Sequence, residues 1–327
     1  MNPEERKQIL SGKGKKVRRK GPATGDGKEK GKGKEEQPPL TLKEQAISWV
    51  KTIVGALVIV MIVNGLFIQS FVVPTGSMEN EVMAGDFVFV NRFIYGGSTP
   101  QTIPFLNIPL PYVSLPGFRD PEVGDVIVFI FPGNREEVEA QEFQYYLKRC
   151  VAVAGDTLEV RDGHAYVNGV KEAPPRNVQW SQDLRFNPER DKHRTFPAGM
   201  GYTRDNWGPM RIPKEGDVIP INIENYSAWR IFIEREGHSV QKDGQLIRID
   251  GEIADSYTVE RDYVFGMGDN RNDSQDSRYW GFIPMDDVVG TPLMVYWSWE
   301  VGDQTHPNSL GDKLANIRWG RIFNGID

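Results

Sequence analysis

The sequence predicts a mainly β protein: an antiparallel, barrel-like β-sheet domain with an irregular insertion, preceded by one N-terminal transmembrane helix. Two observations carry this prediction. One uncharged apolar stretch early in the chain is long enough to cross a bilayer. After it, short β-rich runs alternate with Gly-Asp, Asp-Gly and Asn-Gly pairs, and no convincing helical period occurs between residues 75 and 300.

The predicted span lies in a window without charged residues between Lys51 and Glu79. Its apolar part, IVGALVIVMIVNGLFIQSFVV, covers Ile53–Val73, and we expect an anchor helix over residues 45–72. A cleaved signal peptide is disfavoured because the charged leader and the apolar core are too long and no small-x-small exit follows closely. A buried core helix rarely runs this far without a polar face.

The chain before the span is basic. Residues 1–36 contain twelve Lys or Arg and six Asp or Glu, a net charge of +6, whereas the whole chain is −6. Few apolar side chains occur there, so residues 1–44 are predicted to be a disordered tail. The tail lacks the interleaved aromatics expected for nucleic-acid binding. We expect it to contact anionic lipids on the cytoplasmic side of the cell (inner or plasma) membrane, with residues 73–327 extracytoplasmic.

The chain after Pro74 consists of predicted strands and hairpins. DFVFVNRFIY (Asp86–Tyr95) and DVIVFIF (Asp125–Phe131) are apolar β-rich runs that follow Gly-Asp turns. Asp162-Gly163 and Asn168-Gly169 are strong hairpin signals, and residues 243–259 repeat the same style. These patterns favour antiparallel rather than parallel pairing.

Three segments are less regular. Residues 174–215 are rich in Pro, Arg and Asn and predict an irregular insertion or cap, which we extend to about 174–250. The nearly uncharged loop Ile103–Phe118 is equally compatible with lipid contact and with packing on the β core. The C-terminal LANIRWGRIFNGID is either a short helix or a closing strand. The single cysteine, Cys150, excludes an internal disulfide.

The stretch FVVPTGSM places Ser77 shortly after the span. A serine hydroxyl needs a base to act as a nucleophile at neutral pH. Histidine is the usual base, but all four histidines occur in turns or polar segments, where an ordinary surface role is the better interpretation. A Ser-His-Asp triad stays open because it is defined in space rather than in sequence. The histidines are His164, His193, His238 and His306.

Lysine is the alternative base, and Lys148 lies in the strand-like run QYYLKRCVAVAGD. Alternation along a strand puts Tyr146, Lys148 and Cys150 on one face and Leu147 and Arg149 on the other. Lowering the lysine pKa from about 10.4 to near 7–8 corresponds to roughly 3–4 kcal/mol, which burial can supply. On this segment alone, a lysine whose stem lies on apolar surface and whose amine reaches water is the better interpretation.

The third polar segment is FGMGDNRNDSQDSRYWGFIP, Phe265–Pro284, which suggests a hydrogen-bonded platform. Metal binding is the rival interpretation, because Asp269, Asp273 and Asp276 could offer oxygens. Two arginines in the same loop would neutralise these carboxylates, and the spacing is not that of a calcium loop. We therefore expect neither a metal nor an organic cofactor.

Together, three segments resemble the bacterial type I signal peptidases, the leader peptidases of the S26 type with a Ser/Lys dyad. They are PTGSMENEVMAGDFVFVNRFIYG, YLKRCVAVAGD and GDNRNDSQDSRYWGFIP, in the family's order, and the resemblance spans about residues 50–300. Two stretches depart from the family's pattern: NEV at Asn80–Val82 and CVAVAGD at Cys150–Asp156. Both neighbour the chemistry and leave the nucleophile and base positions intact.

The resemblance implies a role for particular residues. Ser77 would be the nucleophile and Lys148 the general base. The Thr75 hydroxyl and the Ser77 backbone N–H would stabilise the oxyanion, and Ser274 would orient the base. Three further residues match structural supporting positions: Arg149, Asp276 and Arg278. The implied enzyme is a membrane-bound serine protease, a hydrolase that cleaves signal peptides with small residues before the cut from secretory preproteins, through an acyl-enzyme.

Three alternatives remain at this stage. A self-cleaving repressor of the SOS type also uses a Ser/Lys pair on a related β fold, but it carries a DNA-binding domain where this chain has a span. A eukaryotic reticulum-type signal peptidase has His in place of Lys148. The third alternative is a catalytically silent, membrane-tethered β domain that binds preproteins or envelope partners.

Overall fold

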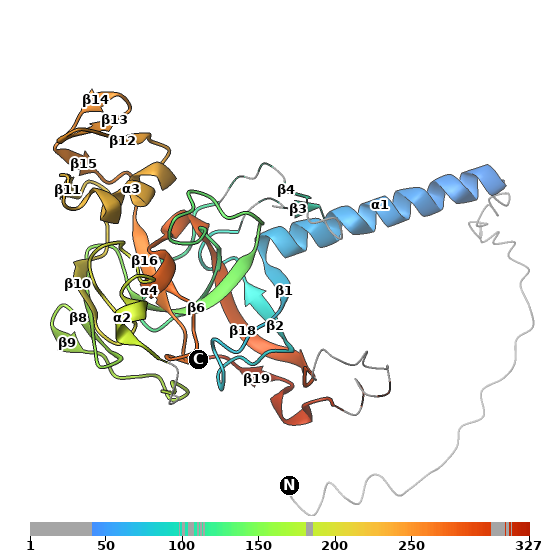
Figure 1. The fold of residues 1–327 in the computed structure, drawn as a ribbon. Coiled ribbons are helices and arrows are strands. Elements are labelled where there is room, and N and C mark those ends of the chain that lie inside the picture. Colours follow the sequence, from blue (N-terminus) through green and yellow to red (C-terminus); the bar gives the residue numbers. More distant parts are fainter. Residues whose placement is uncertain are drawn as a thin grey trace, which may run out of the picture. The chain divides into compact units, whose positions relative to one another are not determined.

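The computed structural model describes residues 41–97, 99, 102–103, 108–109, 111, 113, 115–180, 186–301, 311, 314 and 316–327. The tail before residue 41, residues 104–107, 110, 112 and 114 of the loop 103–118, and His306 lie outside these residues. The chain divides into two units, Met1–Val50 and Lys51–Asp327, and the boundary falls inside the first helix. The strands all belong to the second unit, shown in Figure 1.

Helix α1 (Leu42–Leu66) has a capping box at its start, where Thr41 N donates to Glu44 Oε2 (2.8 Å) and Glu44 N donates to Thr41 Oγ1 (3.4 Å). Its 25 residues extend about 37 Å, which exceeds the hydrocarbon core of a bilayer. It is the one helix in the described part of the chain that is long and apolar enough to span a membrane.

The helix ends earlier than the sequence predicts. Residues Ile68–Val72, expected to be the last part of the anchor, form strand β1, which pairs with β2 (Asp86–Asn91). The segment IQSFV alternates between more and less exposed positions, as in a strand with one face covered. Asn64 and Gly65 are weak helix formers, and they precede the last helical residue.

An eight-stranded antiparallel sheet forms the centre of the second unit and curls into a half-barrel (Figure 1). Its strands run in the order β1-β2-β18-β5-β6-β16-β17, and β19 pairs with β18. Irregularities in the pairing of β18 with both β2 and β5 increase the local bend. The bounds not yet given are β18 Val288–Ser298, β5 Val126–Ile130, β6 Tyr145–Ala152, β16 Tyr263–Met267, β17 Ile283–Pro284 and β19 Asn324–Gly325.

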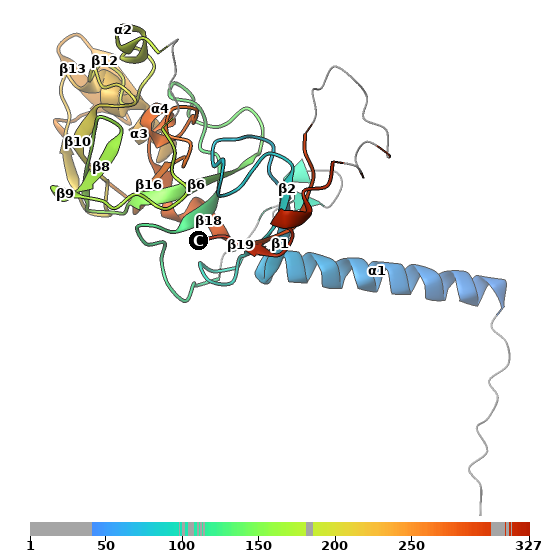
Figure 2. The same cartoon turned by 90° about the horizontal axis from the view of Figure 1, so that it is seen from below.

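A second sheet, β10-β7-β8-β9, contains the hairpins predicted from the sequence and lies beside β6 and β16 (Figure 2). Both turn pairs, Asp162-Gly163 and Asn168-Gly169, have positive φ at each residue. This is the conformation of a two-residue type I′ turn, so the hairpin prediction is confirmed. The strands are β7 Thr157–Arg161, β8 His164–Val167, β9 Val170–Lys171 and β10 Trp207–Arg211.

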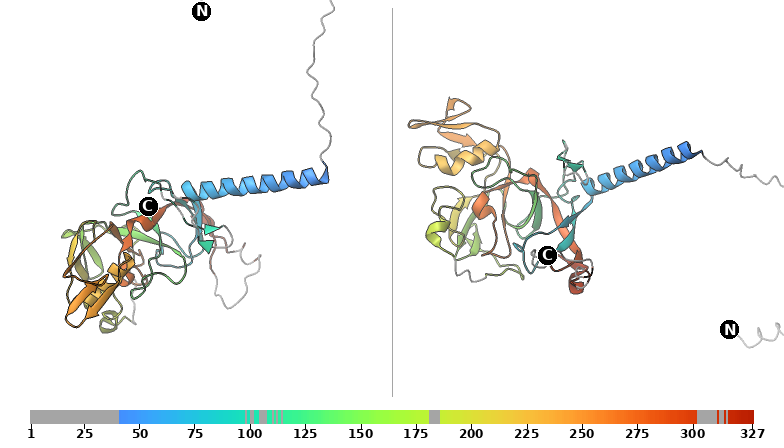
Figure 3. Two further views of the ribbon diagram at one scale, coloured as in Figure 1. Left: turned by 90° about the horizontal axis from the view of Figure 1, so that it is seen from above. Right: turned by 45° about the vertical axis from the view of Figure 1, so that its right-hand side comes forward.

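The remaining elements are short, and β11–β15 with α3 form a small lobe, seen in Figure 1 and in the right view of Figure 3. The strands are β3 Thr102–Ile103, β4 Ile108–Pro109, β11 Val218–Pro220, β12 Val240–Asp243, β13 Leu246–Ile249, β14 Glu252–Ile253 and β15 Ser256–Thr258. The helices are α2 Pro188–Asp191, α3 Tyr226–Arg235, α4 Ser277–Trp280, η1 Met285–Asp287 and η2 Trp319–Arg321.

Helix α3 contradicts the expectation that no helix lies between residues 75 and 300. Ten residues give fewer than three turns, too few for the apolar period to stand out from the sequence. Tertiary packing stabilises it, because Ala228, Ile231 and Phe232 are buried. The segment 174–250 is therefore not irregular throughout. At the C-terminus both expected alternatives occur in part, as the 3₁₀ helix η2 followed by the closing strand β19.

Strand β5 separates two clusters of the core. Val126 and Val128 pack into a cluster with Met78 and Val82, on the side of Ser77. Ile127 belongs to the cluster on the other face, with Phe129, Cys150 and Trp280. Because both faces are covered, β5 reads as a continuous apolar run rather than as an alternating one. The neighbouring strand β6 is held between β5 and β16, so its side chains have fixed positions.

Candidate active site

Ser77 lies in the loop between β1 and β2, and buried residues hold this loop in place. Met78 and Val82 are inaccessible to solvent within the core. The backbone N–H of Asn270 donates to the Ser77 carbonyl (3.1 Å), and its side-chain amide donates to the Gly76 carbonyl (3.3 Å). The third polar segment of the sequence therefore positions the loop of the first.

Lys148 lies in β6 and reaches the same point. Its Nζ is 2.8 Å from Ser77 Oγ and 2.9 Å from the carbonyl oxygen of Leu147. The lysine is 4% exposed, and its Nζ lies over the rings of Tyr146 (5.6 Å) and Trp280 (5.8 Å). Its hydrogen-bond partner Ser77 is 71 residues away in the sequence, and two aromatic rings cover its amine. Lys148 is therefore not a surface lysine whose amine is solvated by water.

Burial lowers the pKa of Lys148 from 10.5 to about 8. The negative charges of Asp276 and Asp269 oppose this shift, and the positive charge of Arg278 adds to it. Desolvation dominates because it removes the hydration that stabilises an ammonium. With a pKa of 8, roughly one-tenth of the lysine is neutral at pH 7, compared with less than about one part in a thousand at its ordinary pKa. A neutral amine can accept the serine proton.

The two other hydroxyls named from the sequence lie near this pair. Thr75 is exposed and lines the same cleft as Ser77 and Lys148. Ser274 is buried, and its Oγ has no hydrogen-bond partner, so the expected bond to Lys148 is not formed in this structure.

Gly268 explains how Ser274 and the Ser77 loop fit together. A Cβ added at Gly268 would lie 2.5 Å from the Ser77 carbonyl oxygen and still closer to Ser274 Oγ. Real Cβ contacts are essentially never this short. The glycine is needed for this close approach.

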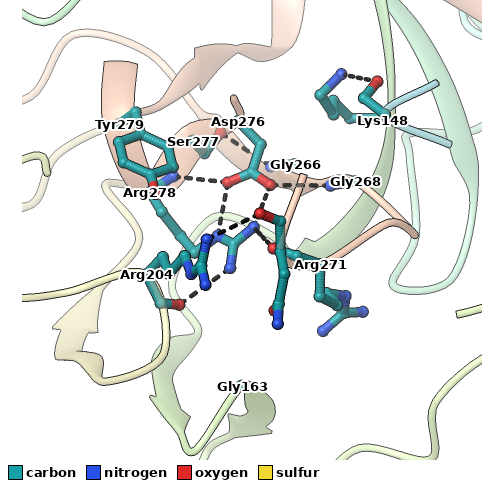
Figure 4. A network of polar contacts seen from close by, with 12 residues as sticks. Lys148, Gly163, Arg204, Gly266, Gly268, Arg271, Asp276, Ser277, Arg278 and Tyr279 are labelled. Atoms are coloured by element: carbon teal, nitrogen blue, oxygen red, sulfur yellow. Dashed lines mark hydrogen bonds and ion pairs between the residues drawn. The ribbon is translucent and has the colours of Figure 1, made fainter. Parts of the chain in front are cut away.

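The predicted supporting residues form two buried ion pairs. Arg149 Nη2 lies 2.7 Å from Asp269 Oδ2, and Arg149 Nη1 also donates to the Gly124 carbonyl (2.8 Å). Arg278 Nη2 lies 2.7 Å from Asp276 Oδ2, which also accepts a bond from the N–H of Gly268 (3.0 Å; Figure 4). Charge-assisted bonds of this kind fix the polar loop in one geometry.

The same pairs bear on the metal alternative. Burial works to raise the pKa of Asp276, but the Arg278 charge and its hydrogen bonds outweigh burial and hold that pKa below its usual range. Asp269 is bound to Arg149, so two of the three candidate carboxylates are already occupied. Within the described residues no group of three or more His, Cys, Asp or Glu is placed to hold a metal ion.

The described histidines lie away from Ser77. His238 contacts Asp250 (2.6 Å) and Glu260 (2.9 Å) through its two ring nitrogens. The His164 ring packs against Trp180, and the His193 carbonyl accepts a bond from an arginine. In the described part of the chain, the basic side chain that contacts Ser77 Oγ is therefore that of Lys148.

Sequence reasoning missed two residues of the site. The sequence places Asp269 in the polar platform, with metal binding as the rival, but predicts no individual role for it as the partner of Arg149. Gln179 was not considered at all. Its N–H donates to the Asp269 carbonyl (2.9 Å), and its carbonyl accepts from the N–H of Arg271 (3.0 Å). Gln179 lies in the segment expected to be irregular, where no sequence pattern marks it.

A cleft of about 690 Å³ surrounds the Ser77–Lys148 pair. Residues 71–78 form one wall and residues 143–148 form another, with Val88 and Val128 between them. The walls are mainly apolar, and the polar groups converge on Ser77. This combination is typical of a site that binds a peptide and acts on it.

The family model described as signal peptidase, peptidase S26, matches residues 46–297. The chain belongs to this family. It is therefore a signal peptidase, a serine peptidase and hydrolase that cleaves signal peptides from preproteins. The resemblance inferred from the three sequence segments is confirmed. Family membership therefore disfavours two of the earlier alternatives, the self-cleaving repressor and the catalytically silent, membrane-tethered β domain.

Curated relatives agree with this membership over most of their length. A signal peptidase I of Helicobacter pylori is 28% identical over 86% of this chain and 91% of the relative. A signal peptidase I of Pseudomonas aeruginosa is 25% identical over 77% of this chain and 73% of the relative. A signal peptidase I of Aquifex aeolicus is 26% identical over 75% of this chain and 82% of the relative. A solved signal peptidase I of Enterococcus faecalis is 21% identical, with a TM-score of 0.25 over 53% of this chain and 97% of that chain.

Gly268→Ala should reduce cleavage strongly, because the added methyl group must displace either Ser274 or the Ser77 loop. Displacements of about 1 Å at a reacting centre can cost on the order of 10²-fold in rate. The measurement is the rate of preprotein cleavage, with circular dichroism to check the fold. Gly320→Ala is the matched control, because a Cβ there meets nothing within 4 Å. A wild-type rate for Gly268→Ala would show that the close approach is unnecessary.

Proposed function

We propose that the signal peptidase acts through a dyad in which Ser77 is the nucleophile and Lys148 the general base. The observation that carries this proposal is the 2.8 Å contact between a buried Lys148 Nζ and Ser77 Oγ inside the cleft. A nucleophile within hydrogen-bond reach of a desolvated base is the arrangement that serine activation needs.

In acylation, neutral Lys148 accepts the Ser77 proton while Oγ attacks the scissile carbonyl carbon. The resulting oxyanion is stabilised by the Ser77 backbone N–H and the Thr75 hydroxyl. Thr75 is exposed at the cleft and carries no committed bond among the described residues, which supports this role. The Lys148 ammonium then gives its proton to the leaving nitrogen, and the mature chain departs with a new N-terminus.

In deacylation, the same lysine removes a proton from water, which attacks the acyl-enzyme ester. The proton passes to Ser77 Oγ as the signal peptide leaves with a free carboxylate. Both half-reactions use one base, so Lys148 must stay close to Oγ throughout and return to its neutral form before each proton abstraction. The aromatic cover from Tyr146 and Trp280 supports this by keeping water from Nζ.

Ser274 is the proposed orienting residue for Lys148. Its buried, unpartnered hydroxyl supports this role, because such a group costs free energy unless a bond forms at some stage of the reaction. Arg149, Asp276 and Arg278 are proposed to hold the platform rather than to take part in chemistry. Each makes charge-assisted bonds inside the protein.

The substrates are preproteins, and we propose that the cleft selects small residues before the cut. We also propose the arrangement in the cell. Residues 1–44 form a cytoplasmic tail on anionic lipid, α1 is the single anchor in the plasma membrane, and residues 73–327 form the extracytoplasmic peptidase domain, with an insertion or cap at about 174–250. The anchor thus ends at Leu66, eleven positions before Ser77. No nucleic-acid partner, metal or cofactor is proposed.

The dyad is tested with detergent-solubilised protein and a preprotein. Ser77→Ala and Lys148→Ala should each abolish cleavage, because nucleophile and base act as a unit. Circular dichroism should show both variants folded. Substantial cleavage by Lys148→Ala near neutral pH would refute the dyad and favour a histidine.

The oxyanion role of Thr75 is tested in the same assay. Thr75→Ser should cleave at nearly the wild-type rate, and Thr75→Val should lose about 10²–10³ in turnover. A wild-type rate for Thr75→Val would remove its oxyanion role.

The pH dependence follows from the direction of the Lys148 shift. The working form is the neutral amine, and its fraction rises as pH rises toward the pKa of about 8. We therefore expect kcat/KM to increase about tenfold per pH unit below 7.5 and to level off above about 9. The measurement is a pH–rate profile at constant ionic strength. A flat profile from pH 6 to 9, or an inflection near 6.5 that is typical of histidine, would contradict the lysine base.

Topology is tested in spheroplasts. The Lys and Arg residues before α1 should stay in the cytoplasm, including Lys43 and Lys51 at the membrane edge. A protease added outside should then digest residues 73–327 and spare about the first forty residues. A reporter that works only outside the cytoplasm should be active when fused after Asp327. An active cytoplasmic reporter at that position would place Ser77 on the wrong side for exported preproteins.

A further inference from the structure

Arg271 is a buried cation without a matching anion. It is 4% exposed, and its Nε has no hydrogen-bond partner. Figure 4 shows its guanidinium turned away from the Asp276 carboxylate, with no drawn interaction reaching it. Among the described residues, neither a hydrogen bond nor an ion pair of this guanidinium is found. Arginine offers five donors, and a buried Nε without a hydrogen-bond partner is unusual.

The surroundings make this cation more costly. Burial and, after it, the positive charges of Arg278 and Arg149 together lower the pKa of Arg271 to about 10, against the opposing effect of the Asp269 and Asp276 carboxylates. Those two carboxylates are already paired with Arg149 and Arg278. One positive charge is therefore left over in the interior. An anion beside it would offset both the desolvation and the repulsion.

A cavity of about 230 Å³ lies against Arg271. Arg149, Cys150, His164 and Trp180 also line it, and Glu172 is its one lining carboxylate among the described residues. The cavity shares no lining residue with the cleft around Ser77. The two linings divide along β6, because residues up to Lys148 line the cleft and residues from Arg149 to Val151 line the cavity.

The Arg271 guanidinium supplies donors to this cavity that are not used elsewhere. Arg149 is committed to Asp269 and to two backbone carbonyls, so it contributes charge rather than free N–H groups. The Trp180 N–H donates to the Gly163 carbonyl (3.2 Å). The Arg271 guanidinium is planar and forked, which matches two oxygens of one oxyanion.

We propose that the cavity at Arg271 is a binding site for a small tetrahedral oxyanion of the phosphate or sulfate class. The guanidinium of Arg271 holds two of its oxygens, and the Arg149 charge adds attraction. Glu172 opposes binding, since its carboxylate repels the same ion. The site is lined by Arg149–Val151 of β6, so an occupied site stabilises the strand that carries Lys148 without entering the peptide cleft.

The test uses the full chain in detergent and inorganic phosphate as the probe. The urea midpoint is measured across a phosphate series at constant ionic strength, with chloride as the matched salt, and the Kd comes from calorimetry. Phosphate should raise the midpoint and chloride should not, because a ligand that binds only the folded state stabilises it. Sulfate in place of phosphate should have the same effect.

Variants identify the site. Arg271→Gln should weaken phosphate binding at least tenfold, and Arg271→Lys should weaken it less, since it keeps the charge but loses the fork. Glu172→Gln should tighten binding several-fold, which also provides a test if Arg271→Gln does not fold. Equal effects of phosphate and chloride on the wild type would overturn the proposal. So would unchanged affinity in Arg271→Gln, or a Glu172→Gln protein that is destabilised without binding phosphate better, because Glu172 would then be the internal partner.

Discussion

The burial of Lys148 is the constraint on which the rest of the site depends. A lysine amine is useful as a base only when it is neutral, and it becomes neutral near pH 8 because water is kept away from it. The strands on either side of β6 and the rings of Tyr146 and Trp280 provide this exclusion. The same burial fixes Nζ at 2.8 Å from Ser77 Oγ, so position and pKa have one cause.

The polar loop that follows β16 serves this constraint in two ways. The backbone N–H of Asn270 donates a hydrogen bond to the Ser77 carbonyl, and the absence of a side chain at Gly268 lets the two loops approach each other closely. Its carboxylates, Asp269 and Asp276, form their ion pairs with Arg149 and Arg278 rather than with the lysine. Ion pairs buried in this manner contribute more to one defined geometry than to net stability.

Strand β6 has a different electrostatic environment along its length. Lys148 lines the peptide cleft, where burial lowers its pKa, whereas Arg149 lines a cavity together with Arg271. The paired charges around Asp269 and Asp276 cancel, and the Arg271 charge does not. The excess positive charge thus lies at a cavity that shares no lining residue with the cleft around Ser77. An oxyanion there would balance the interior without competing for the serine.

The sequence by itself determined the span, the strand-rich domain, the hairpins at Asp162-Gly163 and Asn168-Gly169, and the family. These depend on local patterns: apolar length, alternation, turn chemistry and short motifs. Tertiary structure decided that Ile68–Val72 pairs as a strand instead of extending α1, that α3 forms, and that Gln179 joins the site, since each depends on packing between distant segments. It also decided the state of Lys148, which its own segment left as an ordinary surface lysine. A pKa is set by burial and by charges that are remote in sequence, and no local pattern specifies these.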